Sequence, residues 1–426
     1  MSSSRRLYPA SYAVQTLDRP VNANVWLPGS KSITNRALIV AAQAEGDTEL
    51  SNPLDSDDTA VMRECLTSLG VGIDDSGDSW VIQGSNRVFE PVNNLLDAKA
   101  SGTTARFITG VGALANRPVT IDGTPRMRER PIGDLADALT QLGVDTHSNG
   151  GYPPVTVARG GELGGSALVD ASKSSQFVSA ILLASPSFDR TVRLVIRDNI
   201  VVSRPYIQST IEVMRAFGAS IGEEEGAYIV EPSGYGGVAF PVEPDASAAV
   251  YPAVAAAVTG GRSIIHGLSK ASTQADMKAF TVLEMMGCTV IDSGDDLEVA
   301  GPERLNPVDI DLNTSPDAAL GLAVACLFAH GPSRLRNLQT LRWKETDRIE
   351  ALARELSRLG ASVEIDNDDL IVFPKALRGT TIETYEDHRV AMAFSIVGLA
   401  IPNVVIQNPG CVSKTWPGYF DSLEDW

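Results

Sequence analysis

The feature that most constrains the fold of this chain is an internal repeat. In five places an amphipathic stretch ends in an apolar residue followed by glycine, and a short run with β-branched residues comes next. The five sequences are CLTSLGVGI (65–73), ALTQLGVDT (138–146), VMRAFGASI (213–221), VLEMMGCTV (282–290) and ELSRLGASV (355–363). Their glycines recur every 69 to 75 residues. Each match predicts a helix that is closed by a glycine and followed by a strand.

A second repeated phrase alternates with the first. A polar turn rich in Ser and Asp leads into a nearly all-apolar stretch, which ends at Gly or Pro. This phrase occurs at residues 29–46, 101–118, 172–186, 245–261, 315–331 and 386–402. A helix that is apolar on every face is buried inside the protein. The sequence therefore predicts six α/β units of roughly 70 residues, each with one buried helix, one amphipathic helix and several strands.

The sixth unit is truncated, and this predicts the domain organisation. Residues 12–17 at the N-terminus could supply the strand that the sixth unit lacks. The chain is therefore expected to begin and end in the same domain, with crossovers near Pro28-Gly29 and Pro241–Pro244. We predict one domain of residues 1–28 and 244–426 and a second of residues 29–243, with three units in each. The alternative is a set of unrelated α/β domains in which the phrases match by chance.

The net charge of the chain limits the classes of partner that it can bind. The 35 Lys and Arg residues and the 53 Asp and Glu residues give a formal net charge of −18. Such a field repels nucleic acid and anionic membranes. The longest apolar runs fall short of the roughly 18 residues that a membrane-spanning helix needs, and the N-terminus lacks the apolar segment of a secretory signal. We therefore expect a cytoplasmic protein that binds neither nucleic acid nor membrane.

Common cofactor and nucleophile motifs are missing from the sequence. The four cysteines form no C-x-x-C pair and are too scattered for a disulfide framework. The turn GSKS lacks the upstream glycine of a Walker phosphate loop, and the dinucleotide-like pattern at 110–115 lies within an apolar helical run. H-E-x-x-H and G-x-S-x-G are absent as well. These observations favour chemistry without a metal or a cofactor.

Basic residues gather in the turns that start the buried helices and in the turns beside them. They are Lys31, Arg36, Arg106, Arg126, Arg128, Arg130, Lys344, Arg348, Arg389 and Lys414. Helix N-termini present free N–H groups and the positive end of the helix dipole, so with Lys and Arg they bind phosphate or carboxylate. Any one of these residues alone is more often an ordinary surface or capping residue, and the same holds for Asp317 and His388. Because the charged turn occurs in several units, we predict an anion-binding site between the domains.

Seven motifs in chain order carry a resemblance to a known family. They are LPGSKSITNRAL, GTPRMRERPIGDLADAL, SSQFVSAILL, VSRPYI, KETDRI, DHRVAMAFS and GCVSKTWPGYF, and they extend over nearly the whole chain. In this combination they resemble the 5-enolpyruvylshikimate-3-phosphate synthases, which glyphosate inhibits in many species. The resemblance implies a two-domain inside-out α/β barrel. Each domain would hold three pseudo-symmetric βαβαββ units, with the active site in the interdomain cleft.

The resemblance also implies a reaction. The enolpyruvyl (1-carboxyvinyl) group of phosphoenolpyruvate would be transferred to the 5-hydroxyl of shikimate 3-phosphate, through a tetrahedral intermediate that releases phosphate. This transferase reaction belongs to the shikimate pathway, which leads to chorismate and the aromatic amino acids. The partners would be these two small-molecule substrates, and we expect a monomer without a cofactor or metal.

Carried over residue by residue, the resemblance also implies the residues of the site. Shikimate 3-phosphate would contact Lys31, Ser32, Arg36, Ser174, Ser175, Gln176, Ser203, Tyr206, Asp317, Asn337 and Lys344. Phosphoenolpyruvate would contact Lys31, Gly102, Arg126, Gln176, Arg348, Arg389 and Lys414. Asp317 is the implied base for the 5-hydroxyl and Glu345 the implied proton donor to C3 of phosphoenolpyruvate. Lys31 and His388 complete the implied catalytic set.

The sequence departs from the common family pattern at three positions. Ala100 stands where many members have Asn, Phe107 stands where Pro is common, and Lys173 is an additional cation. These differences bear on inhibitor binding more than on the reaction. One alternative is the related transferase that uses UDP-N-acetylglucosamine, although its usual Lys-Asn pair is Lys31-Ser32 here. The other is a non-catalytic anion-binding protein of the same fold, which would not need the acid–base pair Asp317 and Glu345.

Overall fold

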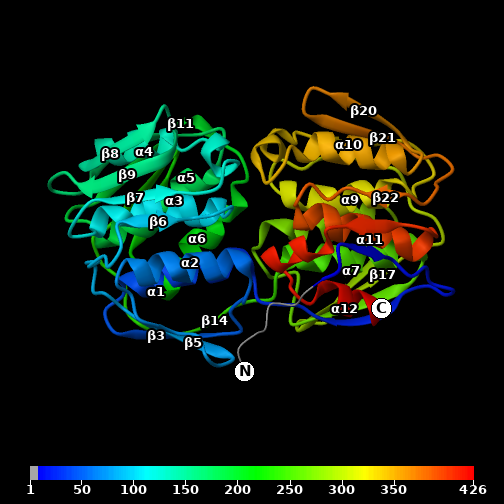
Figure 1. Ribbon diagram of the computed structural model, residues 1–426, viewed down its shortest axis with the longest axis horizontal. Coiled ribbons are helices and arrows are strands. Elements are labelled where there is room, and N and C mark those ends of the chain that lie inside the picture. Colours follow the sequence, from blue (N-terminus) through cyan, green and yellow to red (C-terminus); the bar gives the residue numbers. More distant parts are fainter. Residues whose placement is uncertain (1–7) are drawn as a thin grey trace. The chain divides into compact units, whose positions relative to one another are not determined.

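The chain forms six small β-sheets, in agreement with the six repeated units of the sequence. The structure is a computed structural model that describes residues 8–426, and it divides into two units (Figure 1). Unit 1 is Gly29–Val242, and unit 2 combines residues 8–28 with Glu243–Trp426. Each unit holds three of the sheets and has a hydrophobic core of its own.

The three sheets of unit 1 share one pattern, in which a parallel pair of strands is followed by an antiparallel hairpin. The first sheet contains, in order, β14 (Ala239–Pro241), β3 (Asp47–Ser51), β5 (Ser79–Gln83) and β4 (Ile73–Asp74). The second contains β6 (Leu95–Asp97), β7 (Val119–Asp122), β9 (Tyr152–Arg159) and β8 (Val144–Asn149). The third contains β10 (Gly165–Ala171), β11 (Val192–Val201), β13 (Ala227–Val230) and β12 (Ile221–Glu224).

Unit 2 repeats this pattern twice in full. One sheet contains β2 (Asn22–Trp26), β15 (Arg262–His266), β17 (Asp296–Ala300) and β16 (Thr289–Asp292). Another contains β18 (Asp309–Asp311), β19 (Ser333–Arg336), β21 (Asp369–Phe373) and β20 (Ser362–Asp366). The last sheet has three strands, β22 (Thr381–Ile382), β23 (Val405–Gln407) and β1 (Ser11–Ala13). The antiparallel strand of this truncated sheet comes from the N-terminus, as the sequence predicted, although β1 is shorter than the run 12–17.

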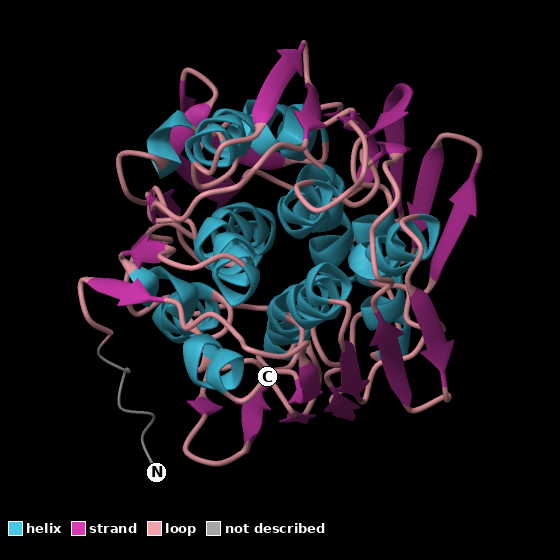
Figure 2. Cartoon of the chain, turned by 90° about the vertical axis from the view of Figure 1, so that its right-hand side faces the viewer, coloured by secondary structure: helices cyan, strands magenta, loops and turns pink. Residues whose placement is uncertain are grey.

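Three buried helices pack against one another in each unit, and Figure 2 shows helices inside with strands around them. In unit 1 they are α1 (Lys31–Gln43), α3 (Gly102–Val111) and α5 (Ser175–Ala184), and in unit 2 they are α7 (Ala246–Thr259), α9 (Ala319–Cys326) and α11 (His388–Ala400). All six lie within the predicted apolar stretches. Among the described residues no helix is long and apolar enough to cross a membrane.

The remaining helices are buried only in part. They are α2 (Asp57–Ser68), α4 (Gly133–Gln141), α6 (Pro205–Ala216), α8 (Lys278–Met285), α10 (Arg348–Arg358) and α12 (Tyr419–Glu424). The glycines that follow α2, α4, α6, α8 and α10 have positive φ angles between 88° and 113°. This left-handed conformation suits glycine because a Cβ atom would be strained there, so the repeated glycine ends the helix as predicted.

Candidate active site

The three buried helices of unit 1 begin at residues that the sequence assigned to substrate. Lys31, Gly102 and Ser175 are the first residues of α1, α3 and α5. The residue ahead of α5, Ser174, caps it by accepting a hydrogen bond from the Gln176 amide. The first N–H groups of a helix have no partner within the helix and carry partial positive charge. Unit 1 therefore presents three helix starts that are suited to bind anions.

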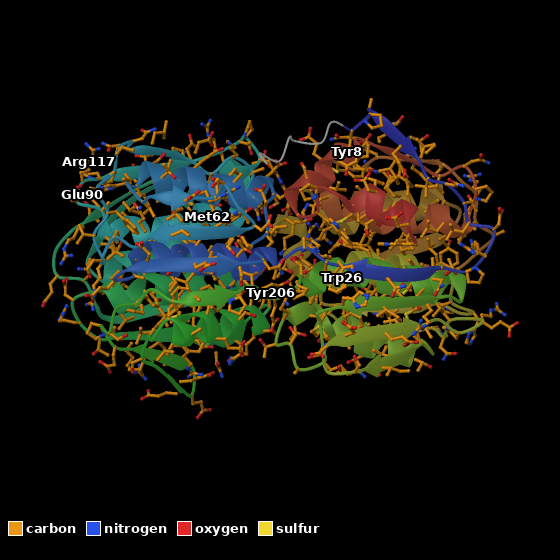
Figure 3. The ribbon with its side chains drawn as sticks, turned by 90° about the horizontal axis from the view of Figure 1, so that it is seen from below. Tyr8, Trp26, Met62, Glu90, Arg117 and Tyr206 are labelled. Atoms are coloured by element: carbon orange, nitrogen blue, oxygen red, sulfur yellow. The ribbon has the colours of Figure 1, made fainter. Side chains whose placement is uncertain are left out.

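Two cations of α1 are held by the protein itself. The ammonium of Lys31 lies 3.2 Å from Oδ2 of Asp58 on α2. Arg36 is buried and donates to the carbonyl oxygens of Ser32 (2.8 Å) and Tyr206 (3.0 Å). Burial lowers the pKa of Arg36 to about 10, which leaves the guanidinium charged at neutral pH. Arg36 thus links the start of α1 to α6, where Figure 3 labels Tyr206.

The start of α3 is crowded by guanidinium groups. A Cβ atom added to Gly102 would lie 2.5 Å from Nη1 of Arg106 and 2.5 Å from Nη2 of Arg130. Arg106 is anchored because its Nη1 donates to the Gly102 carbonyl at 3.1 Å. The amide nitrogen of Gln176 donates to Oγ1 of Thr103 at 3.1 Å, which connects the starts of α5 and α3. The sequence places Arg106 and Arg130 among the clustered cations, but the family resemblance assigns neither of them to the site.

The other assigned residues of unit 1 lie in turns. Arg126 precedes the 3₁₀ turn η2 (Met127–Glu129), and its Nη1 donates to Glu129 at 2.8 Å. Ser203 is buried just before α6 and has a φ angle of +54°, a strained conformation of the kind that gathers at functional sites. The additional cation Lys173 donates to Asp134 at 2.9 Å, and this hydrogen bond raises its pKa.

Arg348 organises the assigned residues of unit 2. Its guanidinium is buried and donates to Asp387 at 2.7 and 3.1 Å, to Asp317 at 2.8 Å and to Glu345 at 3.1 Å. Burial lowers the pKa of Arg348, but the charges of the three carboxylates outweigh this effect and raise it overall. The guanidinium therefore stays charged and fixes three carboxylates around one point.

Three further cations contact these carboxylates. Asp317 lies 3.3 Å from the ammonium of Lys344 and 3.2 Å from Nη2 of Arg389. Glu345 lies 3.6 Å from the ammonium of Lys414, which belongs to the turn η7 (Pro409–Lys414). We call this cluster the Arg348 network. It consists of Asp317, Lys344, Glu345, Arg348, Asp387, Arg389 and Lys414.

Two assigned residues of unit 2 have other surroundings. Asn337 is exposed, and its amide nitrogen donates to Asp311 at 2.7 Å. Its main-chain N–H donates to Asp369, and neither of these two aspartates belongs to the Arg348 network. His388 is fully buried as the first residue of α11, with Nδ1 3.7 Å from Oδ1 of Asp387. Its burial suits support of the neighbouring residues more than direct contact with a substrate.

The sequence assignment missed two acidic residues. Asp387 joins Arg348 and also caps α11 by accepting from the Arg389 amide, and its place in the motif DHR was an available signal. Asp276 is buried and accepts hydrogen bonds from Ser315 at 2.7 Å and from Ser247. Burial raises the pKa of Asp276, and the charge of Asp317 raises it further. As an isolated acid far from any cationic turn, Asp276 carried no signal in the sequence.

Comparisons with known proteins identify the family of the chain. The family model described as EPSP synthase (3-phosphoshikimate 1-carboxyvinyltransferase) matches residues 16–423. A 3-phosphoshikimate 1-carboxyvinyltransferase of Nostoc punctiforme is 43% identical over 414 residues, which cover 96% of this chain and 97% of that protein. One of Aliivibrio fischeri is 42% identical over 415 residues, covering 95% and 97%.

A solved structure shows the same fold. The EPSP synthase of Acinetobacter baumannii aligns with a TM-score of 0.81 at 24% identity and covers 97% of each chain. The fold is thus the two-domain α/β fold that the resemblance implied. With the family model and the curated relatives extending over nearly all of its length, the chain belongs to the EPSP synthase family and is an enolpyruvyl transferase of the shikimate pathway.

Proposed function

We propose that this chain transfers the enolpyruvyl group of phosphoenolpyruvate to shikimate 3-phosphate with the residues that the family resemblance assigns. The observation that carries this proposal is the Arg348 network, in which both proposed acid–base carboxylates, Asp317 and Glu345, are held by one buried guanidinium. An anion-binding protein would gain nothing from two carboxylates among its cations, because they repel the ligand. Acid–base catalysis of enolpyruvyl transfer requires them.

The reaction requires a base, an acid and several cations. The 5-hydroxyl oxygen of shikimate 3-phosphate bonds to C2 of phosphoenolpyruvate and loses its proton, while C3 gains a proton. The tetrahedral intermediate then loses the C3 proton and phosphate, which restores the carbon–carbon double bond. Two phosphates and two carboxylates must be bound while this happens, so charge stabilisation and orientation supply much of the rate enhancement.

Asp317 is the base in this proposal. Its Oδ1 lies 2.8 Å from Nη1 of Arg348, and its Oδ2 lies 3.2 Å from Nη2 of Arg389. Substrate carboxylate and phosphate groups compete with Asp317 for these cations. When the substrates bind, they take over part of this pairing and leave the Asp317 carboxylate able to accept the proton of the 5-hydroxyl.

Glu345 is the proton donor to C3. Its two oxygens face two different cations, because Oε2 lies 3.1 Å from Arg348 and Oε1 lies 3.6 Å from Lys414. Both cations are also proposed to bind phosphoenolpyruvate. The carboxyl group that protonates C3 is therefore fixed by the same side chains that hold the molecule it protonates, which is the orientation that proton transfer needs.

Unit 1 supplies the helix starts and hydroxyl groups. Lys31 would contact both substrates, Gly102 would allow phosphoenolpyruvate to approach the N–H groups of α3, and Ser174, Ser175 and Gln176 would bind shikimate 3-phosphate at the start of α5. The close approach at Gly102 is supported by the lack of space for a side chain beside Arg106 and Arg130.

A steady-state assay of phosphate release tests the proposal. With phosphoenolpyruvate and shikimate 3-phosphate the enzyme should release phosphate, and with UDP-N-acetylglucosamine as acceptor it should not. Replacing Lys31 by Met in unit 1 and Arg389 by Lys in unit 2 should each raise the Michaelis constant for phosphoenolpyruvate, because each removes a charged or bidentate contact to its anionic groups. If neither variant changes that constant, the residue assignment is wrong even though the family is known.

Three further expectations extend this proposal. The predicted division into domains of residues 1–28 with 244–426 and residues 29–243 can be tested by producing residues 29–243 alone and measuring cooperative unfolding. The expected monomer would give a light-scattering mass near 45.2 kDa. The expected cytoplasmic location can be tested by cell fractionation.

A further inference from the structure

Helix α10 contacts the segment before α11 at two points seven residues apart. At its first residue, Arg348 binds Asp387 through two hydrogen bonds of 2.7 and 3.1 Å. Further along the helix, Glu355 accepts a hydrogen bond of 2.7 Å from the Tyr385 hydroxyl and one of 3.3 Å from the Glu383 amide. Residues seven apart lie on the same face of a helix. One face of α10 therefore binds both ends of residues 383–387.

The bound segment has an unfavourable backbone conformation. Tyr385 and Glu386 have φ angles of +53° and +56°, so two consecutive residues with side chains adopt the left-handed conformation. The Asp387 amide donates to the Thr384 carbonyl at 2.8 Å and closes the turn. Such a turn persists only when its surroundings hold it in place.

This turn determines where the next residues lie. Asp387 follows the two left-handed residues and caps α11, accepting a 2.9 Å hydrogen bond from the Arg389 amide. Arg389 then contacts Asp317 at 3.2 Å. A change in the backbone at Tyr385 would therefore move both the partner of Arg348 and the starting point of the Arg389 side chain.

Glu355 is unusual among the carboxylates of α10. Its side chain is fully buried, and its hydrogen bonds and ion pair go to residues outside the Arg348 network. Its charge is balanced by Arg358, whose Nη1 lies 3.0 Å away. A buried carboxylate is costly to place in a protein unless its hydrogen bonds are needed, and both of the bonds it makes toward the neighbouring segment go to residues 383 and 385.

We propose that Glu355 and Tyr385 are a positioning pair for the phosphoenolpyruvate-binding arginines. The pair holds the strained turn so that Asp387 orients Arg348 and Arg389 points to Asp317. Neither residue is assigned to a substrate. The proposal rests on the assignment of Arg348 and Arg389 to phosphoenolpyruvate, so the experiment below includes a variant that tests that assignment separately.

Two matched variants test the positioning pair. Tyr385→Phe removes only the hydroxyl that binds Glu355. Tyr12→Phe is the control, because the Tyr12 hydroxyl donates to Glu424 at 2.8 Å in the same unit and makes the same kind of bond. We expect Tyr385→Phe to raise the Michaelis constant for phosphoenolpyruvate about tenfold, a loss of about 1.4 kcal/mol. The constant for shikimate 3-phosphate should stay the same, and Tyr12→Phe should change neither constant.

The outcome separates positioning from stability. If Tyr385→Phe lowers the melting temperature as Tyr12→Phe does and leaves the constant for phosphoenolpyruvate unchanged, the pair is merely structural and the proposal is overturned, provided that Arg389→Lys does raise the constant. If Arg389→Lys also leaves it unchanged, the assignment of the arginines is wrong instead. Should Tyr385→Phe fail to fold, Glu355→Gln, which keeps the side-chain shape but removes its charge, gives the same comparison with Glu424→Gln as its control.

Discussion

Replacing Asp317 by Asn removes the proposed base while keeping the shape of the side chain. General base catalysis contributes about 10²- to 10⁴-fold to a rate, so turnover should fall by that factor. The remaining Oδ1 of Asn still accepts from Arg348, which donates to Asp317 at 2.8 Å in the native enzyme. A hydrogen bond to a charged group contributes roughly 1.5–3 kcal/mol to the free energy of unfolding. The substitution should cost only a fraction of this, so the variant should fold.

The charges of the Arg348 network predict how binding responds. Its four cations and three carboxylates carry a net charge of +1, and the substitution raises this to +2. Anionic substrates are attracted more strongly to the more positive network. The dissociation constants of phosphoenolpyruvate and shikimate 3-phosphate should therefore stay the same or decrease while turnover falls.

Phosphate release under saturating substrates measures the turnover, and calorimetric titration measures the binding. Asp189→Asn is the control, since Asp189 is also bound by an arginine, with Nη2 of Arg159 at 2.7 Å, but belongs to no site. Its turnover should match that of the native enzyme. A turnover of Asp317→Asn close to the native value would refute the assignment of Asp317, and weaker binding of both substrates would refute the electrostatic reasoning.

Three other predictions follow from the same geometry. Glu345→Gln should lower turnover by about 10²- to 10⁴-fold. It should also slow the exchange of the C3 protons of phosphoenolpyruvate with solvent, which NMR in deuterium oxide measures, and a normal exchange rate would contradict the role of Glu345 as proton donor. Ala100 is exposed, so an Asn side chain fits there and could donate a hydrogen bond to an anion. Ala100→Asn should therefore tighten binding of phosphoenolpyruvate, glyphosate or both by about tenfold. Weaker inhibition by glyphosate together with a lower melting temperature would contradict this prediction. The pKa of Asp276 is raised above its unfolded value of 3.8. Its protonated carboxyl therefore contributes fully to stability below pH 3.8, and this contribution is lost as the pH rises through the higher pKa of the folded state. Urea unfolding of Asp276→Asn should accordingly show a free energy of unfolding that improves relative to the native enzyme as the pH rises above 3.8. A difference that does not change with pH would show that the folded and unfolded states bind this proton equally.

The repeated helices and turns could be predicted from the sequence because each of them is determined by its own residues. A glycine with positive φ after each amphipathic helix, such as Gly70 or Gly360, is required by the backbone alone. Helices that are apolar on every face, such as α9, have no favourable position except in a core. These local rules hold wherever the segment is placed, so the number of units and the class of the fold could be predicted without a structure.

The arrangement of the site depends on contacts that local rules do not reach. Asp387 caps α11, as its sequence position suggests, but its pairing with Arg348 joins residues 39 apart and follows from the packing of α10 beside α11. Asp317 lies close enough to Asp276 for its charge to raise the pKa of Asp276, although 41 positions separate the two residues in the sequence. The family resemblance assigned Asp317 and Glu345, but which cation each oxygen faces could be known only from side-chain geometry.

The pairing of β1 with β23 affects how the chain is made. Ser11 pairs with Gln407, so the first strand to leave the ribosome must wait for one of the last. At a synthesis rate of about 5–20 residues per second, this delay is roughly 20–80 s. The sequence of unit 1 is complete by Val242, whereas the hydrophobic core of unit 2 includes residues from both ends of the chain. During synthesis the N-terminal strand is therefore an unpaired edge, and a chaperone that covers it would protect the chain from aggregation.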